Sequence, residues 1–222
     1  IAMVTDVAGV NDQSFNQTSW EATKDFADKN GKTVNYYRPT EDSTAARLAA
    51  MEQAVNKGAK VIVCPGYLFE DAVYEAQTTY PDVKFVLIDG QPHTADYQTY
   101  ETKSNTVSII FKEEIAGFLA GYAAVKDGNT KLGFCGGMAV PAVQRYGSGF
   151  VQGAEAASKE MGINTTLKYY YAGAFAATDG ATATMKSWYT EGTETVFACG
   201  GKVFQSVVAG CQEGNTKATW IG

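Results

Sequence analysis

A short stretch near the start of the chain, residues 6–17, gathers residue types that could bind a small molecule. It follows an apolar run and precedes a helical pattern over residues 15–29, so we expect a loop between a strand and a helix. Asp6 and Asn11 would supply directed hydrogen bonds, and Phe15 a flat apolar face for a ring. In an open α/β sheet, ligands bind at such loops, outside the carboxyl ends of the strands. The alternative interpretation is that Phe15 caps a hydrophobic core and Asp6 only ends a strand.

The spacing of Ser14 and Gln17 predicts where this helix begins. The two residues form an S-x-x-Q pattern, which is typical of a capping box at a helix N-terminus. The helix should therefore start at Phe15, and a ring in its first turn would point toward the open mouth of the sheet.

Further candidate residues follow three other predicted strands. They are Asp89 at the end of residues 83–89, Phe175 after residues 166–171, and Gly200 and Gly201 after residues 195–199. If Phe15 and Phe175 face each other, a flat ring fits between them, and each aromatic pair adds about 0.5–1.5 kcal/mol beyond the buried area. Asp89 would join Asp6 and Asn11 in fixing the orientation of that ring. The alternative for Phe175 is ordinary core packing.

Strand and helix patterns alternate along the whole chain. Strands are expected at residues 1–6, 33–37, 60–64, 83–89, 106–111, 131–135, 166–171, 195–199 and 218–221. Helices are expected at residues 15–29, 41–57, 67–79, 112–126, 140–161, 179–190 and 203–212, and residues 90–105 should form a polar loop. This alternation predicts an α/β fold with right-handed crossovers and parallel sheets, in two similar lobes over residues 1–111 and 112–222.

Composition argues against several classes of function. The chain has 222 residues, 45% of them apolar, which suffices for a sizeable core. Its 18 basic and 24 acidic residues give a formal charge of 18 − 24 = −6 without a basic run, which argues against nucleic acid as a partner. The single histidine, His93, leaves little material for a histidine-based metal site or for Ser-His-Asp catalysis. We therefore expect no cofactor and no metal.

The motifs favour a binding protein over an enzyme. No G-x-G-x-x-G follows a strand, and no P-loop is present, so a nucleotide-dependent enzyme on this fold has little support. The effector domain of a regulator would share the fold, but the sequence has no basic DNA-binding segment. A binding protein for a sugar, an autoinducer or a nucleobase stays open, because a sugar also stacks on aromatic side chains and the two phenylalanines do not settle the ligand.

The four cysteines of the chain do not form a C-x-x-C motif, so zinc and redox chemistry are disfavoured. Cys64, Cys135 and Cys199 lie at or near the ends of apolar runs, and we expect buried thiols there. A disulfide between Cys199 and Cys211 is left open, because its geometry is strict.

A set of short motifs follows in one order along the chain. The first is D-V-A-G-V-N-D-Q-S-F-N-Q-T-S-W-E, and F-V-L-I-D, F-L-A-G-Y, G-G-M, G-A-F and C-G-G come after it. Together they span essentially the whole chain, and in this order they resemble the basic membrane protein family. That family comprises substrate-binding lipoproteins of ABC importers, several of which bind purine nucleosides.

The resemblance implies a type I periplasmic-binding-protein fold, with two Rossmann-like lobes that close on a ligand by hinge motion. The ligand-binding residues that it implies are Asp6, Asn11, Phe15, Asn16, Asp89, Phe175, Gly200 and Gly201. The two phenylalanines would hold a purine base, the polar residues after the first strand would bond its edge, and the glycine pair would lie near the sugar. Lys202 departs from the family pattern, in which a smaller residue is common.

The resemblance also implies partners and a location. We expect a monomeric, extracytoplasmic protein, periplasmic or anchored as a lipoprotein, that delivers a nucleoside such as guanosine, inosine or adenosine to the ABC permease of its importer. Its only membrane contact would be a lipid anchor that this sequence does not contain. We expect the second lobe to be incomplete, because an aspartate and a lysine for the ribose would follow Gly222.

Overall fold

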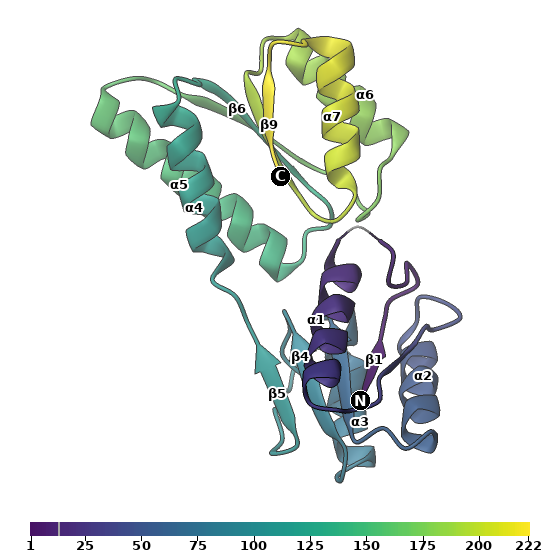
Figure 1. Cartoon of the computed structure of the whole chain (residues 1–222). Helices are drawn as coiled ribbons and strands as arrows, with labels where there is room; N and C mark the ends of the chain where they lie inside the picture. The colour runs from purple at the N-terminus through teal and green to yellow at the C-terminus, as the bar shows by residue number, and fades with distance from the viewer. Residues whose placement is uncertain (13) are drawn as a thin grey trace. The chain divides into compact units, whose positions relative to one another are not determined.

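The computed structural model describes residues 1–12 and 14–222, which fall into two compact units (Figure 1). The first unit is Ile1–Phe111, and the second is Lys112–Gly222. Strands alternate with helices in both units, and the ladders between their strands are parallel. The predicted α/β fold with parallel sheets is confirmed.

The first unit is built on a five-stranded sheet of order β2-β1-β3-β4-β5. Its elements are β1 (Ala2–Val4), α1 (Phe15–Lys29), β2 (Asn35–Tyr37), α2 (Thr44–Asn56), β3 (Val61–Pro65), the 3-10 turn η1 (Tyr67–Phe69), α3 (Glu70–Thr79), β4 (Lys84–Ile88) and β5 (Thr106–Ile109). Because β1, β3 and β4 are parallel neighbours, the loops that follow them leave from the same edge of the sheet.

Alternate residues of the central strands face opposite layers of this unit. Val4, Ile62 and Leu87 belong to the core that the sheet forms with α2 and α3. Met3 and Val63 are also buried, and the two-residue period of a strand directs them to the other face. There α1 covers β3, so the middle of the sheet has helices on both faces.

The second unit is built on a four-stranded sheet of order β7-β6-β8-β9. Its elements are α4 (Glu113–Lys126), β6 (Lys131–Gly136), α5 (Pro141–Met161), β7 (Thr166–Tyr171), α6 (Asp179–Thr190), β8 (Thr195–Cys199), α7 (Val203–Gly214) and β9 (Thr219–Ile221). Phe134 and Phe197 pack against α4 and α5, whereas Cys135 and Val196 pack against α6 and α7. The strict alternation divides the core of this unit between the two faces of its sheet.

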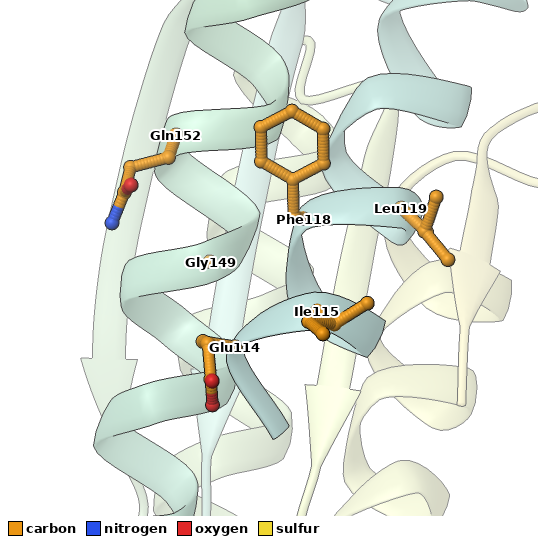
Figure 2. A pocket seen from close by; sticks show the side chains of 6 residues that line it. All are labelled: Glu114, Ile115, Phe118, Leu119, Gly149 and Gln152. Carbon is orange, nitrogen blue, oxygen red and sulfur yellow. The ribbon is translucent and has the colours of Figure 1, made fainter. Parts of the chain in front are cut away.

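Glycines let α4 and α5 lie in backbone contact. A Cβ added to Gly149 would lie 2.1 Å from the backbone oxygen of Glu114, and one added to Gly153 would lie 1.9 Å from that of Phe118. Figure 2 shows the hollow that remains on the outer surface of this helix pair. It is lined by Glu114, Ile115, Phe118, Leu119, Gly149 and Gln152. None of these residues belongs to a loop that leaves the carboxyl end of a strand, where the ligands of α/β proteins bind.

The predicted elements all appear, with boundaries shifted by a few residues. The predicted helix over residues 67–79 is instead a 3-10 turn followed by α3. Residues 90–105 form a loop that contains an isolated bridge between His93 and Tyr100. None of the helices in the described part of the chain has the length and apolar character that crossing a membrane requires.

The cysteines are buried and reduced. Burial raises the pKa of the Cys135 thiol to about 12 and moves that of Cys64 further above its usual range. The Sγ of Cys211 lies 3.4 Å from the backbone oxygen of Ala218, and no disulfide joins Cys211 to Cys199.

Candidate functional site

Asp6 leaves the carboxyl end of β1 with one carboxylate oxygen held in place. Its Oδ1 accepts hydrogen bonds from the backbone amide of Ala8 at 2.7 Å and from Nδ2 of Asn16 at 2.9 Å. Its backbone amide in turn donates to Oδ1 of Asn16 at 3.5 Å. Among the described residues, no hydrogen bond to Oδ2 of Asp6 is formed, and the residue is half-buried. Asp6 therefore has one fixed oxygen and one that can accept a further donor.

Asp12, rather than Ser14, caps the helix that follows. Oδ1 of Asp12 accepts from the backbone amides of Ser14 at 3.0 Å and Gln17 at 2.9 Å, and Oδ2 accepts from that of Asn16 at 3.1 Å. Helix α1 does begin at Phe15, but the Ser14 side chain makes no capping hydrogen bond. The predicted capping box is therefore wrong. A buried carboxylate satisfies more of the orphan amides of the first turn than a serine hydroxyl can, and its charge suits the positive end of the helix.

Asn11 and Asn16 occupy different environments in this loop. Asn11 is exposed, whereas Asn16 is only 2% exposed on the inner face of α1. Nδ2 of Asn16 also donates to Oδ2 of Asp12 at 3.0 Å, so both of its amide hydrogens are directed at carboxylates. Asn11 can reach a ligand directly, while the polar atoms of Asn16 are already occupied.

Phe15 presents its ring beside the carboxyl end of β3. The side chain is 39% exposed, and a Cβ added to Gly66 would lie 3.9 Å from its Cε1. Tyr67 is the residue directly after Gly66 in the chain. Burial, with a smaller contribution from the negative charge of Asp42, raises the pKa of the Tyr67 phenol above its ordinary value. The hydroxyl is therefore neutral near pH 7 and can donate a hydrogen bond.

The loop after β4 is tied to the start of α3. Asp89 adopts a left-handed backbone conformation, with φ of 60°, and its amide donates to the backbone oxygen of Ile109 at 2.7 Å. Glu70 then accepts from the backbone amide of Gln91 at 2.9 Å and pairs with Nε2 of His93 at 3.1 Å. His93, the only histidine, thus lies 4% exposed in a structural contact that holds this loop.

Phe175 lies in a recess that glycines make possible. A Cβ added to Gly137 would lie 2.5 Å from Cδ1 of Phe175, and one added to Gly200 would lie 2.9 Å from the same atom. The backbone oxygen of Phe175, in turn, lies 2.9 Å from a Cβ added to Gly201 and accepts from the amide of Lys202 at 3.0 Å. These glycines follow β6 and β8, so the ring sits against the carboxyl ends of both strands.

The sequence-predicted residues thus form one group in each unit. In the first unit, Asp6, Phe15 and Asn16 come from the β1–α1 loop and the start of α1, and Asp89 directly follows β4. Strand β3 lies between β1 and β4 in the sheet. In the second unit, Phe175 contacts Gly200 and Gly201 directly. Every group lies at the carboxyl edge of a parallel sheet, where ligands of α/β proteins bind.

Sequence reasoning missed residues that shape these loops. Asp12 could have been found, because an acidic side chain just before a helix favours capping. Arg38 follows β2, and its Cδ lies 3.8 Å from a Cβ added to Gly9, which places a cation beside the loop of Asp6. No pattern in the sequence signals that contact, nor the one that Glu70 makes with the loop after β4.

Comparison with known proteins decides the family. The family model described as an ABC transporter substrate-binding protein, PnrA-like, matches residues 1–222. The chain belongs to the Bmp family. The resemblance to basic membrane proteins that the sequence motifs indicated is therefore confirmed. The family description is that of a transport protein and not of an enzyme.

Individual relatives of this Bmp chain agree with that membership. It is 29% identical over 205 residues to the ABC transporter nucleoside-binding protein BmpA of Lactococcus lactis, covering 91% of the chain and 55% of the relative. It is also 29% identical over 229 residues to a CD4+ T-cell-stimulating antigen of Listeria monocytogenes, covering 100% of the chain and 61% of the relative. The Bmp chain thus spans little more than half the length of these relatives.

A solved structure supports the fold. An ABC transporter solute-binding protein from Aeropyrum pernix is 22% identical, with a TM-score of 0.82 over 100% of this chain and 62% of that one. The Bmp chain therefore has the fold of the periplasmic binding proteins of type I.

Proposed function

We propose that the chain is the substrate-binding part of an ABC importer and that it binds a purine nucleoside. The observation that carries the proposal is an aromatic side chain at the carboxyl edge of each sheet. Phe15 is 39% exposed beside β3, and Phe175 is half-buried in a recess of glycines beside β6 and β8. A purine has two flat apolar faces, and one phenylalanine would stack on each. The nucleoside-binding relative from Lactococcus lactis supports this ligand class.

The polar residues are assigned to the edge of the base. Oδ2 of Asp6 accepts a ring N–H or an exocyclic amine, and Asn11 and Asp89 add further directed hydrogen bonds. Gly200 and Gly201 are assigned to the sugar through their backbone, while Phe175 occupies the space that their side chains would take. Asn16 supports the same loop.

The partners follow from this role. A solute-binding protein of an importer works outside the cytoplasm and delivers its ligand to a membrane permease. We propose that the full-length protein is a lipid-anchored or periplasmic monomer outside the cytoplasm and that its partner is the membrane permease. The two units would close on the nucleoside, and small-angle scattering should show compaction when guanosine saturates the protein.

Calorimetric titration of the full-length protein tests the ligand. The protein is first unfolded and refolded to remove any carried-over solute, and is then titrated with guanosine, adenosine, cytidine and ribose. Tight binding of a purine nucleoside with no response to ribose is the expected result. Binding of ribose alone would move the function to a sugar-binding protein on the same fold, and no response to any of the four would refute the proposal.

A matched pair of variants tests the first stacking residue. Phe15→Ala should weaken binding of the purine nucleoside by at least about 1 kcal/mol, because one stacking face and its buried area are lost. Phe26→Ala is the control, since Phe26 lies on the same helix and is 59% exposed. Equal dissociation constants for Phe15→Ala and the wild type would remove Phe15 from the site.

A further inference from the structure

Asp12 is unusually well bonded for a residue in a ligand-binding loop. It is 6% exposed, and its two oxygens accept three backbone amides and the side-chain amide of Asn16. A buried carboxylate is stable only where such donors replace its lost hydration. With this set filled, Asp12 has little capacity left for a ligand, so its contribution is to the shape of the loop.

Asn16 connects this carboxylate to Asp6. One amide hydrogen goes to Oδ2 of Asp12 at 3.0 Å, and the other goes to Oδ1 of Asp6 at 2.9 Å. Because the carbonyl oxygen of Asn16 faces the backbone amide of Asp6 at 3.5 Å, the carboxamide has one orientation that serves both partners. The side chain is 2% exposed, so it is shielded from competing water.

These hydrogen bonds also affect Oδ2, the second carboxylate oxygen of Asp6. A free aspartate rotates about its side-chain torsions, and a ligand must then order it on binding. Here the Ala8 amide and Asn16 both hold Oδ1, which fixes the carboxylate and leaves Oδ2 without a hydrogen bond among the described residues. An acceptor that is already oriented binds a donor more tightly, because less conformational entropy is lost.

We propose that Asp12 and Asn16 act as a clamp that positions Asp6, so that Oδ2 of Asp6 is presented to the ligand before the ligand arrives. Both are positioning residues, and Asn16 does not contact the ligand. The proposal deepens the proposed function, and it rests on that function only for the chemistry of the ligand. If Asp12 and Asn16 had a purely structural role, they would cap α1 without affecting Asp6.

Amide exchange in the ligand-free, full-length protein tests the clamp without any ligand. In Asn16→Ala, Asp6 loses a partner, and the amide of Ala8 that bonds Oδ1 should exchange at least about fivefold faster. Asn30→Ala is the matched control, because Asn30 also bonds α1, at its other end, through Nδ2 and the backbone oxygen of Phe26 at 2.8 Å. Unchanged exchange at Ala8 in Asn16→Ala, or an equal change in Asn30→Ala, overturns the clamp.

A double-mutant cycle with guanosine then tests the link to binding. Asn16→Ala should raise the dissociation constant about tenfold, the size expected for one lost charge-assisted hydrogen bond. In an Asp6→Ala background the same substitution should change it less than about twofold, since Asn16 acts through Asp6. Equal effects in the two backgrounds overturn the positioning role. If the wild type does not bind guanosine while Ala8 exchanges as expected, the clamp stands and the purine assignment fails.

Discussion

Gly137→Ala is a sharp test of how the second unit holds its aromatic ring. The added methyl group would lie 2.5 Å from Cδ1 and 2.8 Å from Cε1 of Phe175. Both distances are far below carbon–carbon contact, so the ring must leave its recess. Unlike Gly200 and Gly201, with φ of 135° and 47°, Gly137 has no positive φ, so alanine does not strain the backbone there.

Gly137→Ala should change both the folding free energy and the binding free energy, and the two are measured separately. Displacing a packed ring from a tight recess costs about 1–3 kcal/mol of folding free energy. A ring that has moved also stacks less well on a base, which costs about 1 kcal/mol of binding free energy, or about a fivefold rise in the dissociation constant.

The assay is a set of four proteins, each measured by urea unfolding and by titration with guanosine. They are the wild type, Gly137→Ala, Phe175→Ala and the double variant. Gly180→Ala serves as the control, because no atom outside its own helix backbone and chain neighbours lies within 4 Å of the added Cβ and its φ is not positive. In the Phe175→Ala background the ring is gone, so Gly137→Ala should cost much less, since only the 3.1 Å approach of its Cβ to the backbone oxygen of Ala174 remains.

Two results would refute this reasoning. If Gly137→Ala unfolds and binds like the wild type, Phe175 is not confined by the glycine, and the recess has no role in setting the ring. If Gly137→Ala costs the same stability with and without Phe175, the methyl group clashes with something else.

The remaining predictions concern the scaffold. Asn105→Ala should lower the free energy of unfolding by about 2–3 kcal/mol, since the two hydrogens of its buried Nδ2 are shared among three backbone oxygens at 3.0, 3.1 and 3.3 Å, and urea denaturation measures the loss. Gly153→Ala should destabilise by about 1–3 kcal/mol in the same assay, because its Cβ would lie 1.9 Å from a backbone oxygen of α4 and force the helices apart. Backbone hydrogen bonds from Lys131 and Thr130 lower the pKa of Glu194, so the stability it adds is present above the ordinary glutamate pKa of about 4.3 and is lost as the pH falls through its folded value. Glu194→Gln should therefore be about 1 kcal/mol less stable than the wild type near pH 7, and a gap that does not shrink as the pH is lowered below the ordinary glutamate pKa would contradict this.

The elements and the family were readable from the sequence because each depends on local pattern. Short apolar runs, or runs rich in β-branched and aromatic residues, several of them ended by glycine or aspartate, predicted the strands, and amphipathic periods predicted the helices. The exits of the strands are fixed once the strands are parallel, so Asp6, Asp89 and Phe175 could be placed at sheet edges in advance. The order of the motifs along the chain was enough to indicate the Bmp family, which the family model confirms.

The tertiary structure was needed to find contacts between residues far apart in the sequence, and to show which of two nearby side chains captures a given backbone amide. The S-x-x-Q spacing favoured Ser14 as the cap, yet Asp12 captures the same amides because a buried carboxylate offers two oxygens in reach of them. Gly200 was predicted to lie near the sugar and Gly137 was part of a glycine motif, and only packing shows that both make space for Phe175. Residue types and their order are set by the chain itself, but which side chain occupies which space is decided when strands from distant positions are brought together.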